Sequence, residues 1–253
     1  MTIRTVNTNG VAVIEIARPE KKNALTQAMY TAMAEAIVAA DADASIRAVL
    51  ITGQPGIFTS GNDLEDFMMR PPQGEDSPVF QFMKALVECA KPVVAAVTGG
   101  AIGIGTTLLL HCDLVYVSDE ARLAMPFVGL GLVPEYASSL LVTQRVGHAK
   151  ATELLLLGEP FNGEAAVEMG IANAVLPAAE VVNHARRMAE RFNALPPGAV
   201  RESKALMRRA QKSLVEETIR TEAEIFGKRL RSPEAMEAFQ AFFQKRKPDF
   251  SKF

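Results

Sequence analysis

Residues 92–105 read PVVAAVTGGAIGIG, and this stretch decides the fold class. Its first half, 92–97, is a short continuous apolar run, which is typical of a strand buried on both faces of a parallel sheet. The glycine-rich half, 99–105, predicts a turn that leads into a helix over 106–111. A further apolar run at 114–117 predicts the next strand. This alternation predicts an α/β protein whose parallel strands are joined by crossover helices.

The sequence before this stretch predicts a hairpin, a helix and another strand. Asn9-Gly10 separates two β-rich runs, Ile3–Thr8 and Val11–Ile16, and is a strong hairpin signal because both residues tolerate positive φ. Thr26 is placed to cap a helix, and residues 47–52 are typical of a buried strand. The apolar stripe expected on that helix consists of Met29, Met33, Ile37 and Ala40.

The pattern becomes mostly helical from Pro134 onward. Pro134 suits the first turn of one helix and Pro196-Pro197 that of another, while Ser232-Pro233 is a cap followed by proline at the first helical position. The sequence therefore predicts a mixed α/β core over residues 1–195 and a helical region over 196–253.

The composition excludes several classes of protein. The chain has 253 residues, of which 49% are hydrophobic and 22% charged, so it can bury a large core and has too much apolar surface for a disordered chain. A formal net charge of −2 argues against a nucleic-acid partner. The two cysteines, Cys89 and Cys112, and the three histidines show neither a disulfide framework nor zinc spacing, so we expect no metal.

The apolar runs predict a cytoplasmic protein with no membrane partner. No run approaches the roughly 20 residues of a membrane-spanning helix, and the N-terminal residues lack the apolar core of a signal peptide. The final Ser251-Lys252-Phe253 resembles the peroxisomal Ser-Lys-Leu signal but ends in phenylalanine, so a peroxisomal location in a eukaryote and a plain basic tail are both open.

Three segments contain residues suited to chemistry. In 58–64, Gly61 lets the backbone approach a ligand closely, although it also fits an ordinary turn. In 99–105, free N–H groups at a helix N-terminus would stabilise an anion, although such turns are often only tight connections. In 134–139, Glu135 is a carboxylate expected in the first turn of a helix, where it would also complement the helix dipole.

The glycine-rich segment does not match a dinucleotide-binding fingerprint. That fingerprint is G-x-G-x-x-G, and after Gly103-Ile104-Gly105 its third glycine falls on Leu108. Asp119 and Glu120 lie where an acid that binds the ribose would lie. The glycine spacing weighs against a nicotinamide enzyme.

Ordered motifs along almost the whole chain resemble the crotonase superfamily of enoyl-CoA hydratases and isomerases. The matching segments are Arg18-Pro19-x-x-Lys22-Asn23-Ala24-Leu25, Phe58-x-x-Gly61-Asn62-Asp63-Leu64, Lys91-Pro92-Val93-Val94-Ala95-Ala96-Val97, Cys112-Asp113-Leu114 and Ala165-x-x-x-Gly170. The resemblance implies a ClpP-like β-β-α spiral core with a C-terminal helical trimerisation region, and hence a homotrimer or hexamer. Because this fold supports many acyl-CoA reactions, the reaction depends on individual residues.

The resemblance also implies an acyl-CoA thioester substrate, with CoA as part of the substrate and no separate cofactor. Its oxyanion hole would consist of the backbone N–H groups of Asn62 and Ile104, which would stabilise an enolate. The residues expected to bind substrate are Ala24, Ser60, Gly61, Asn62, Asp63, Leu64, Gly103, Phe127, Phe242 and Lys245. For Lys245, a solvated basic tail is the alternative.

Departures from the hydratase pattern indicate the reaction. Where hydratases of the superfamily carry two glutamates, this sequence has Thr107 and Phe127, which cannot activate water as carboxylates do. Glu135, within residues 134–139 (PEYASS), resembles the single catalytic glutamate of peroxisomal-type Δ3,Δ2-enoyl-CoA isomerases. The resemblance implies that Glu135 moves a proton from C2 to C4 of a 3-enoyl-CoA, while Phe127 excludes water and raises the pKa of Glu135. Enoyl-CoA hydration, another crotonase reaction and non-catalytic acyl-CoA binding are the alternatives.

Overall fold

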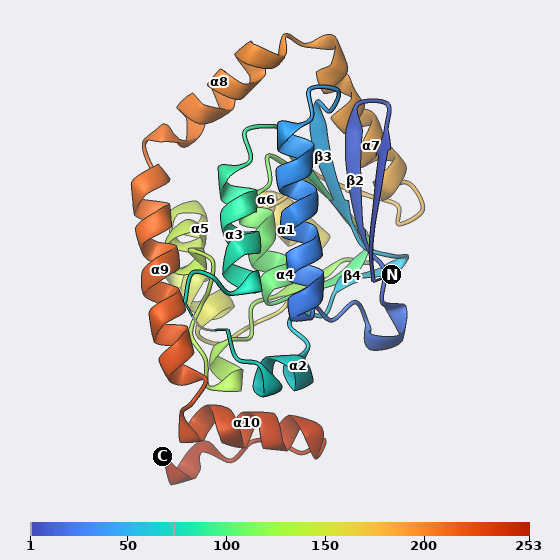
Figure 1. Ribbon diagram of the computed structural model, residues 1–253. Helices are drawn as coiled ribbons and strands as arrows, with labels where there is room; N and C mark the ends of the chain where they lie inside the picture. Colours follow the sequence, from blue (N-terminus) through green and yellow to red (C-terminus); the bar gives the residue numbers. More distant parts are fainter. Residues whose placement is uncertain (1, 73) are drawn as a thin grey trace.

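The computed structural model describes residues 2–72 and 74–253, with Met1 and Gln73 outside the described residues, and it contains two β-sheets surrounded by helices (Figure 1). The strands are β1 (Ile3–Thr8), β2 (Val11–Ile16), β3 (Ala48–Thr52), β4 (Gly56–Thr59), β5 (Val93–Val97), β6 (Gly99–Ile102), β7 (Leu114–Ser118), β8 (Arg122–Ala124), β9 (Phe161–Asn162) and β10 (Ala174–Leu176). The helices are α1 (Gln27–Ala42), α2 (Leu64–Met69), α3 (Pro78–Glu88), α4 (Ile104–Thr107), α5 (Ser138–Leu155), α6 (Gly163–Glu168), α7 (Val181–Glu190), α8 (Pro197–Arg209), α9 (Lys212–Arg229) and α10 (Pro233–Phe243).

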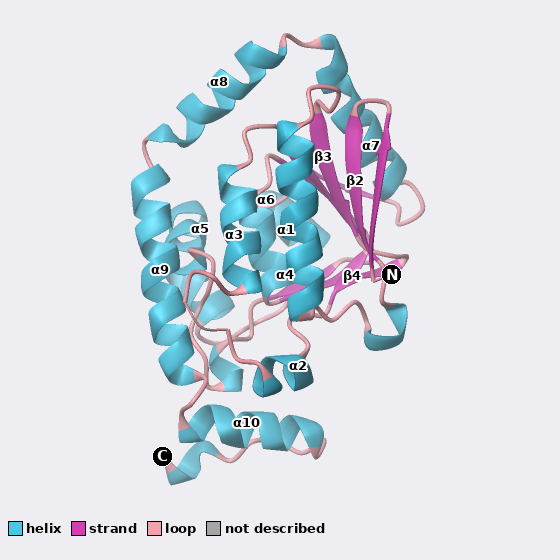
Figure 2. Cartoon of the chain, viewed as in Figure 1, coloured by secondary structure: helices cyan, strands magenta, loops and turns pink. Residues whose placement is uncertain are grey.

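The larger sheet lies between two helical layers. Its strand order is β1-β2-β3-β5-β7-β10, and all neighbouring pairs except β1-β2 are parallel. Successive side chains of β3 belong to opposite layers: Val49 and Ile51 join the core cluster of α1 and α3, whereas Ala48 and Leu50 join that of α7. Figure 2 shows α1 and α7 on either side of these strands. The predicted α/β class with parallel strands is confirmed.

Local signals set the N-terminal elements as expected. β1 and β2 form an antiparallel hairpin, in which Asn9 and Gly10 both adopt positive φ, 47° and 72°. The Thr26 side chain accepts a hydrogen bond from the Met29 backbone N–H at the start of α1. The buried residues of α1 include the whole predicted stripe, Met29, Met33, Ile37 and Ala40.

The glycine-rich segment corrects one expectation. We expected a turn over 99–105, but Gly99–Ile102 forms strand β6 of the smaller sheet, β4-β6-β8-β9, and the chain turns only at Gly103. Gly99 has φ +126°, and a Cβ there would lie 2.1 Å from the carbonyl oxygen of Gly56 on β4. Here glycine serves the close approach of two strands, a tertiary requirement that overrides its local turn preference.

The segment around Glu135 corrects a second expectation. Pro134 and Glu135 were expected in the first turn of a helix, yet α5 begins only at Ser138. Tyr136 and Ala137 both adopt left-handed conformations, with φ of 62° and 55°. A right-handed helix cannot include such residues, so the chain reverses before the helix begins. Glu135 therefore lies in a turn.

The C-terminal helices pack along the core. Helices α8 and α9 follow one side of the molecule, and α10 lies across its end near α2 (Figure 1). Pro197 and Pro233 occupy the first turns of α8 and α10, as predicted. The buried Lys204 ammonium of α8 donates to Asp113 and to the Lys91 carbonyl oxygen, each at 2.6 Å, which ties this helix to the core. Over the described ranges, no helix is both long and apolar enough to cross a membrane.

The contact between Gly56 and Gly99 predicts a large stability effect. An alanine at position 99 would place Cβ against the Gly56 carbonyl oxygen at a strained φ, so we expect Gly99→Ala to lower the free energy of unfolding by about 3 kcal/mol. Urea denaturation followed by circular dichroism measures this change. Gly198→Ala on α8 is the control, because a Cβ there meets open space and changes stability by at most about 1 kcal/mol. Equal effects at the two positions would contradict the close approach.

Candidate active site

Strands β4 and β6 of the smaller sheet run parallel, so they end at the same edge. The carboxyl ends of parallel strands are the usual place for ligands in α/β proteins. Here β4 leads into Ser60-Gly61-Asn62-Asp63, and β6 leads through Gly103 into α4. Both connections line one cavity of about 740 Å³. The parallel pairing therefore brings together the two segments in which sequence analysis located the oxyanion donors.

The first expected donor, the Asn62 N–H, is left free by the pairing of its neighbours. The Leu25 N–H donates to the Gly61 carbonyl oxygen at 2.8 Å, and the Asp63 N–H donates to the Leu25 carbonyl oxygen at 2.9 Å. Successive residues of an extended chain direct their backbone groups to opposite sides, so the Asn62 N–H faces away from Leu25. Gly61 has φ +92°, and a Cβ there would lie 3.0 Å from the Ile102 carbonyl oxygen. Glycine thus lets this loop lie against the end of β6.

The second expected donor, the Ile104 N–H, begins helix α4. The Gly103 N–H donates to the Ala124 carbonyl oxygen at 2.9 Å, and the Gly103 carbonyl oxygen accepts from the N–H groups of Thr106 and Thr107. N–H groups in the first turn of a helix have no intrahelical partner. Within residues 2–72 and 74–253, neither Ile104 nor Asn62 has an acceptor for its backbone N–H. Both residues line the same cavity.

Most of the expected substrate-binding residues line this cavity. They are Ala24, Ser60, Gly61, Asn62, Asp63, Leu64, Gly103, Phe127 and Phe242. Lys245 is not among the described residues that line it and lies exposed beyond α10. Lys21 and Lys22 line it instead. Lysine side chains can bind phosphates as point charges, so the positive charge at this cavity comes from the segment after β2, which sequence analysis did not assign to it.

The resemblance to hydratases places two glutamates at positions 107 and 127. This chain has Thr107 and Phe127 there, and neither side chain has a carboxyl group. Thr107 is fully buried, with its hydroxyl 3.5 Å from the Ile104 carbonyl oxygen. The Phe127 ring lies beside Gly103 in the cavity of the two N–H groups. Phe127 is not among the described residues that line the cavity of Glu135.

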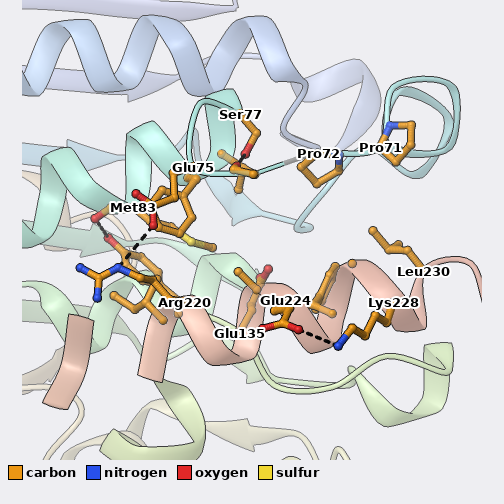
Figure 3. Close-up of a pocket in the computed structure, with 18 of the residues that line it drawn as sticks. Pro71, Pro72, Glu75, Ser77, Met83, Glu135, Arg220, Glu224, Lys228 and Leu230 are labelled. Carbon is orange, nitrogen blue, oxygen red and sulfur yellow. Dashed lines mark hydrogen bonds and ion pairs between the residues drawn. The ribbon is translucent and has the colours of Figure 1, made fainter. Parts of the chain in front are cut away.

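Glu135 lines a second cavity of about 440 Å³, between α3 and α9 (Figure 3). The residue is 5% exposed, and its Oε1 atom has no hydrogen-bond partner among the described residues. Burial raises the pKa of Glu135 to about 8, and the negative charge of Glu222 adds to the shift. The pKa of Glu135 is therefore raised, as the sequence predicts, and exclusion of water is the main cause.

The turn that carries Glu135 is anchored through Tyr136. The Tyr136 hydroxyl donates to the Met83 carbonyl oxygen at 2.9 Å, and the His111 ring stacks on the Tyr136 ring at 3.9 Å. Nε2 of His111 lies 2.8 Å from the Tyr136 carbonyl oxygen. A carbonyl can only accept, so Nε2 carries the proton. Burial lowers the pKa of His111 to about 3, and the ring is neutral at ordinary pH. These contacts stabilise the two left-handed residues that follow Glu135.

An aromatic pair borders both cavities. Phe67 of α2 and Phe226 of α9 line each of them, and their rings meet edge to face with centroids 6.1 Å apart. Sequence analysis missed both residues, because their apolar side chains carry no local sign of a site.

Tyr30 is a further link that sequence analysis missed. It follows Met29 in the apolar face of α1 and is fully buried, and its hydroxyl donates to the side-chain oxygen of Asn62. Burial, and then the charge of Glu135, raise the pKa of Tyr30 well above its ordinary value. Tyr30 is therefore hydrogen-bonded to the Asn62 side chain and is also affected by the charge of Glu135. A buried tyrosine needs a partner for its hydroxyl, and that requirement was the available signal.

The described part of the chain has no group of three or more His, Cys, Asp and Glu side chains arranged to hold a metal ion.

Comparison with known proteins gives a consistent result. A family model described as Enoyl-CoA hydratase/isomerase matches residues 6–252. A Bacillus subtilis protein named probable enoyl-CoA hydratase is 31% identical over 246 residues, which are 95% of each chain. Human enoyl-CoA delta isomerase 2 is 32% identical over 252 residues, 97% of this chain and 64% of the human one. The solved structure of Pseudomonas aeruginosa OdaA is 55% identical with a TM-score of 0.94, covering 95% of this chain and 98% of that one.

The raised pKa of Glu135 predicts a pH-dependent cost to folding. The folded protein keeps this proton up to about pH 8, whereas the unfolded chain releases it near its ordinary value of 4.5. Between those values the folded state binds more protons, so the free energy of unfolding contributed by Glu135 falls as the pH rises. Glu135→Gln removes the ionisation. We therefore expect this variant to gain at least about 1 kcal/mol over the parent between pH 5 and pH 8, measured by urea denaturation.

Glu217→Gln is the matched control for this measurement, because Glu217 lies exposed on α9. Its stability difference from the parent is expected to stay constant over the same pH range. If Glu135→Gln gave the same constant difference, the raised pKa of Glu135 would be contradicted.

Proposed function

Because the chain belongs to the enoyl-CoA hydratase/isomerase family, we propose that it isomerises 3-cis- and 3-trans-enoyl-CoA to trans-2-enoyl-CoA, a step in the oxidation of unsaturated fatty acids. The observation that carries the proposal is one buried carboxyl with a free oxygen, Glu135, in a cavity adjoining that of two unpaired backbone N–H groups, those of Asn62 and Ile104.

The two N–H groups would bind the thioester carbonyl oxygen. When the Glu135 carboxylate removes a proton from C2, the electrons of the C2–H bond form a dienolate whose negative charge lies largely on that oxygen. Each fixed donor in such a hole stabilises the developing charge by about 3–4 kcal/mol. Glu135 then returns the proton at C4, and the double bond moves from C3–C4 to C2–C3. One carboxyl completes the cycle, and the reaction consumes no water and no cofactor.

The surroundings of Glu135 suit a base that shuttles one proton. A carboxylate with a pKa of about 8 is a stronger base than an ordinary glutamate, which helps it to remove a weakly acidic proton. The lining includes Phe80, Met83 and Phe226, which are apolar and keep water away from the dienolate. Exclusion of water would favour return of the same proton.

The substrate would extend through both cavities. The phosphates of CoA would bind near Lys21 and Lys22 in the larger cavity, with the thioester at Asn62 and Ile104. C2 to C4 of the acyl chain would lie where the two cavities adjoin, beside the Phe67–Phe226 pair and within reach of Glu135, and the rest of the chain would occupy the cavity of Glu135. Its apolar lining suits a hydrocarbon chain.

Hydration of a 2-enoyl-CoA is the competing reaction, in keeping with the name of the Bacillus subtilis relative. Hydration in this superfamily would need a second carboxyl that can act on water. Glu222 is the carboxyl whose negative charge acts on Glu135. However, both of its oxygens accept hydrogen bonds from residues at the start of α5, and it does not line either cavity. This arrangement favours isomerisation over hydration.

We also propose that copies of the chain associate, as a homotrimer or a dimer of trimers, through the helical region over 196–253. Large apolar side chains of α8 and α9 are exposed, among them Met207 at 85%. A row of such side chains on neighbouring helices is typical of an association surface. Light scattering with size-exclusion chromatography tests this assembly.

Glu135→Gln tests the proposed reaction. Without a base, we expect turnover of 3-cis- and 3-trans-enoyl-CoA to fall by about 10³-fold, while KM changes less than about threefold. The increase in ultraviolet absorbance on conjugation of the double bond to the thioester follows the reaction for several chain lengths. Glu217→Gln on exposed α9 is the control. Full activity of Glu135→Gln, or faster hydration of 2-enoyl-CoA than isomerisation by the parent, would overturn the proposal.

The pH dependence of kcat/KM is a separate prediction. The base must be ionised to remove the C2 proton, so kcat/KM is expected to rise about tenfold per pH unit and to level off near pH 8, the pKa of Glu135. Initial rates between pH 6 and pH 9.5 give this profile. A rate independent of pH below 8 would show that a different group takes the proton.

A further inference from the structure

Glu222 is a buried carboxylate, 6% exposed, contributed by the C-terminal helix α9. Its Oε2 accepts from the backbone N–H of Ala137 at 2.5 Å. Its Oε1 accepts from both the backbone N–H and the hydroxyl of Ser139, at 2.9 and 2.5 Å. Burial raises the pKa of Glu222 above its ordinary value, and the three donors around its carboxylate oppose that shift.

These contacts hold the start of α5. Ala137 precedes the helix in a left-handed conformation, and its own side chain provides no cap. Orphan N–H groups at a helix N-terminus need acceptors, and a negative charge there is favourable. Glu222 supplies both from a helix that lies 85 residues further along the chain. Sequence analysis considered Glu135 as the negative charge that complements the dipole of this helix. In the structure, Glu222 has that position.

We propose that Glu222 is a positioning residue for Glu135: its carboxylate holds the turn that presents Glu135 and keeps a second negative charge beside it. The catalytic part of this inference rests on the proposed function. The claim that Glu222 holds the turn of Glu135 applies to the protein without substrate, and its support is the hydrogen bonds to Ala137 and Ser139.

Other charged side chains also line the cavity of Glu135. On the cavity wall, Arg220 of α9 forms an ion pair with Glu75 at 3.4 Å, and Lys228 with Glu224 at 2.6 Å (Figure 3). Among the residues that the structure describes, the remaining titratable groups that line this cavity or lie near Glu135 are exposed Arg231, the Tyr30 and Tyr136 hydroxyls, and neutral His111, which contacts Tyr136. Glu222 is the charge that acts on Glu135.

The two carboxyls therefore have different roles. The hydrogen-bond donors of Glu222 stabilise its carboxylate form against the effect of burial, and the negative charge of that form opposes ionisation of Glu135. Glu135 lines the cavity, has a buried oxygen without a hydrogen-bond partner among the described residues, and takes up the proton. Removing the charge of Glu222 is thus expected to lower the pKa of Glu135, so that the base becomes weaker and ionises at lower pH.

Glu222→Gln tests the inference by the pH profile. We expect the pH at which kcat/KM levels off to move down by about one unit, and kcat on the plateau to fall about tenfold with KM unchanged. Glu217→Gln, which removes the same charge from an exposed position of α9, is expected to move neither value. A variant that merely folds less well would lose active enzyme without changing the pH at which the rate levels off.

A second measurement does not need turnover. The infrared band of the protonated Glu135 carboxyl, assigned by its loss in Glu135→Gln, is titrated in the free parent and in Glu222→Gln. A lower midpoint in Glu222→Gln supports the inference even if the parent isomerises no enoyl-CoA, an outcome that would refute only the proposed function. Equal midpoints would overturn the inference whatever the enzyme does.

Ser139→Ala separates position from charge and replaces Glu222→Gln if that variant does not fold. It removes one donor to Glu222 and keeps both carboxylates. We expect kcat to fall about threefold to tenfold, with the midpoint of Glu135 within about half a unit of the parent value. An unchanged kcat would show that the turn does not depend on this contact, and would contradict the positioning role.

Discussion

The parallel pairing of β4 with β6 is the constraint on which the site depends. The strands meet where Gly56 and Gly99 touch, and a side chain at Gly99 would overlap the Gly56 carbonyl group. Because both strands then end at one edge, the loop after β4 and the start of α4 line a single cavity. The unpaired N–H groups of Asn62 and Ile104 follow from this pairing and from the bonds that engage their neighbours. A wider spacing of these strands would separate the two groups.

The second half of the site comes from the C-terminal helices. Helix α9 supplies Glu222 to the turn of Glu135 and Phe226 to the border between the two cavities, and α10 supplies Phe242 to the larger one. The apolar surroundings of Glu135 therefore depend on packing between segments that are far apart in the sequence. A buried acid with a raised pKa lowers stability at neutral pH, and the hydrogen bonds of Glu222, Tyr136 and His111 offset that cost.

Sequence analysis reached the fold class, the hairpin, the cap at Thr26 and the segments that line the cavity. It was wrong where long-range contacts decide local structure. Residues 99–102 form a strand because β4 lies beside them, and Glu135 lies outside a helix because Tyr136 and Ala137 are held in left-handed conformations. It assigned Lys245 to substrate binding, whereas Lys21 and Lys22 line the cavity. It predicted that exclusion of water would raise the pKa of Glu135, and burial does raise it.

The amino-acid sequence by itself determined the features that depend on residues a few positions apart: the Asn9-Gly10 turn, the capped amphipathic helix α1, the buried apolar strands and the motifs typical of the enoyl-CoA hydratase/isomerase family. Tertiary structure alone decided which glycines let two strands approach closely and which turn the chain. It also decided what surrounds Glu135. The physical reason is that burial and charge act through space. Burial raises the pKa of Glu135, and Glu222 of α9 adds to the shift and also caps α5. No local pattern in the sequence connects Glu135 with Glu222.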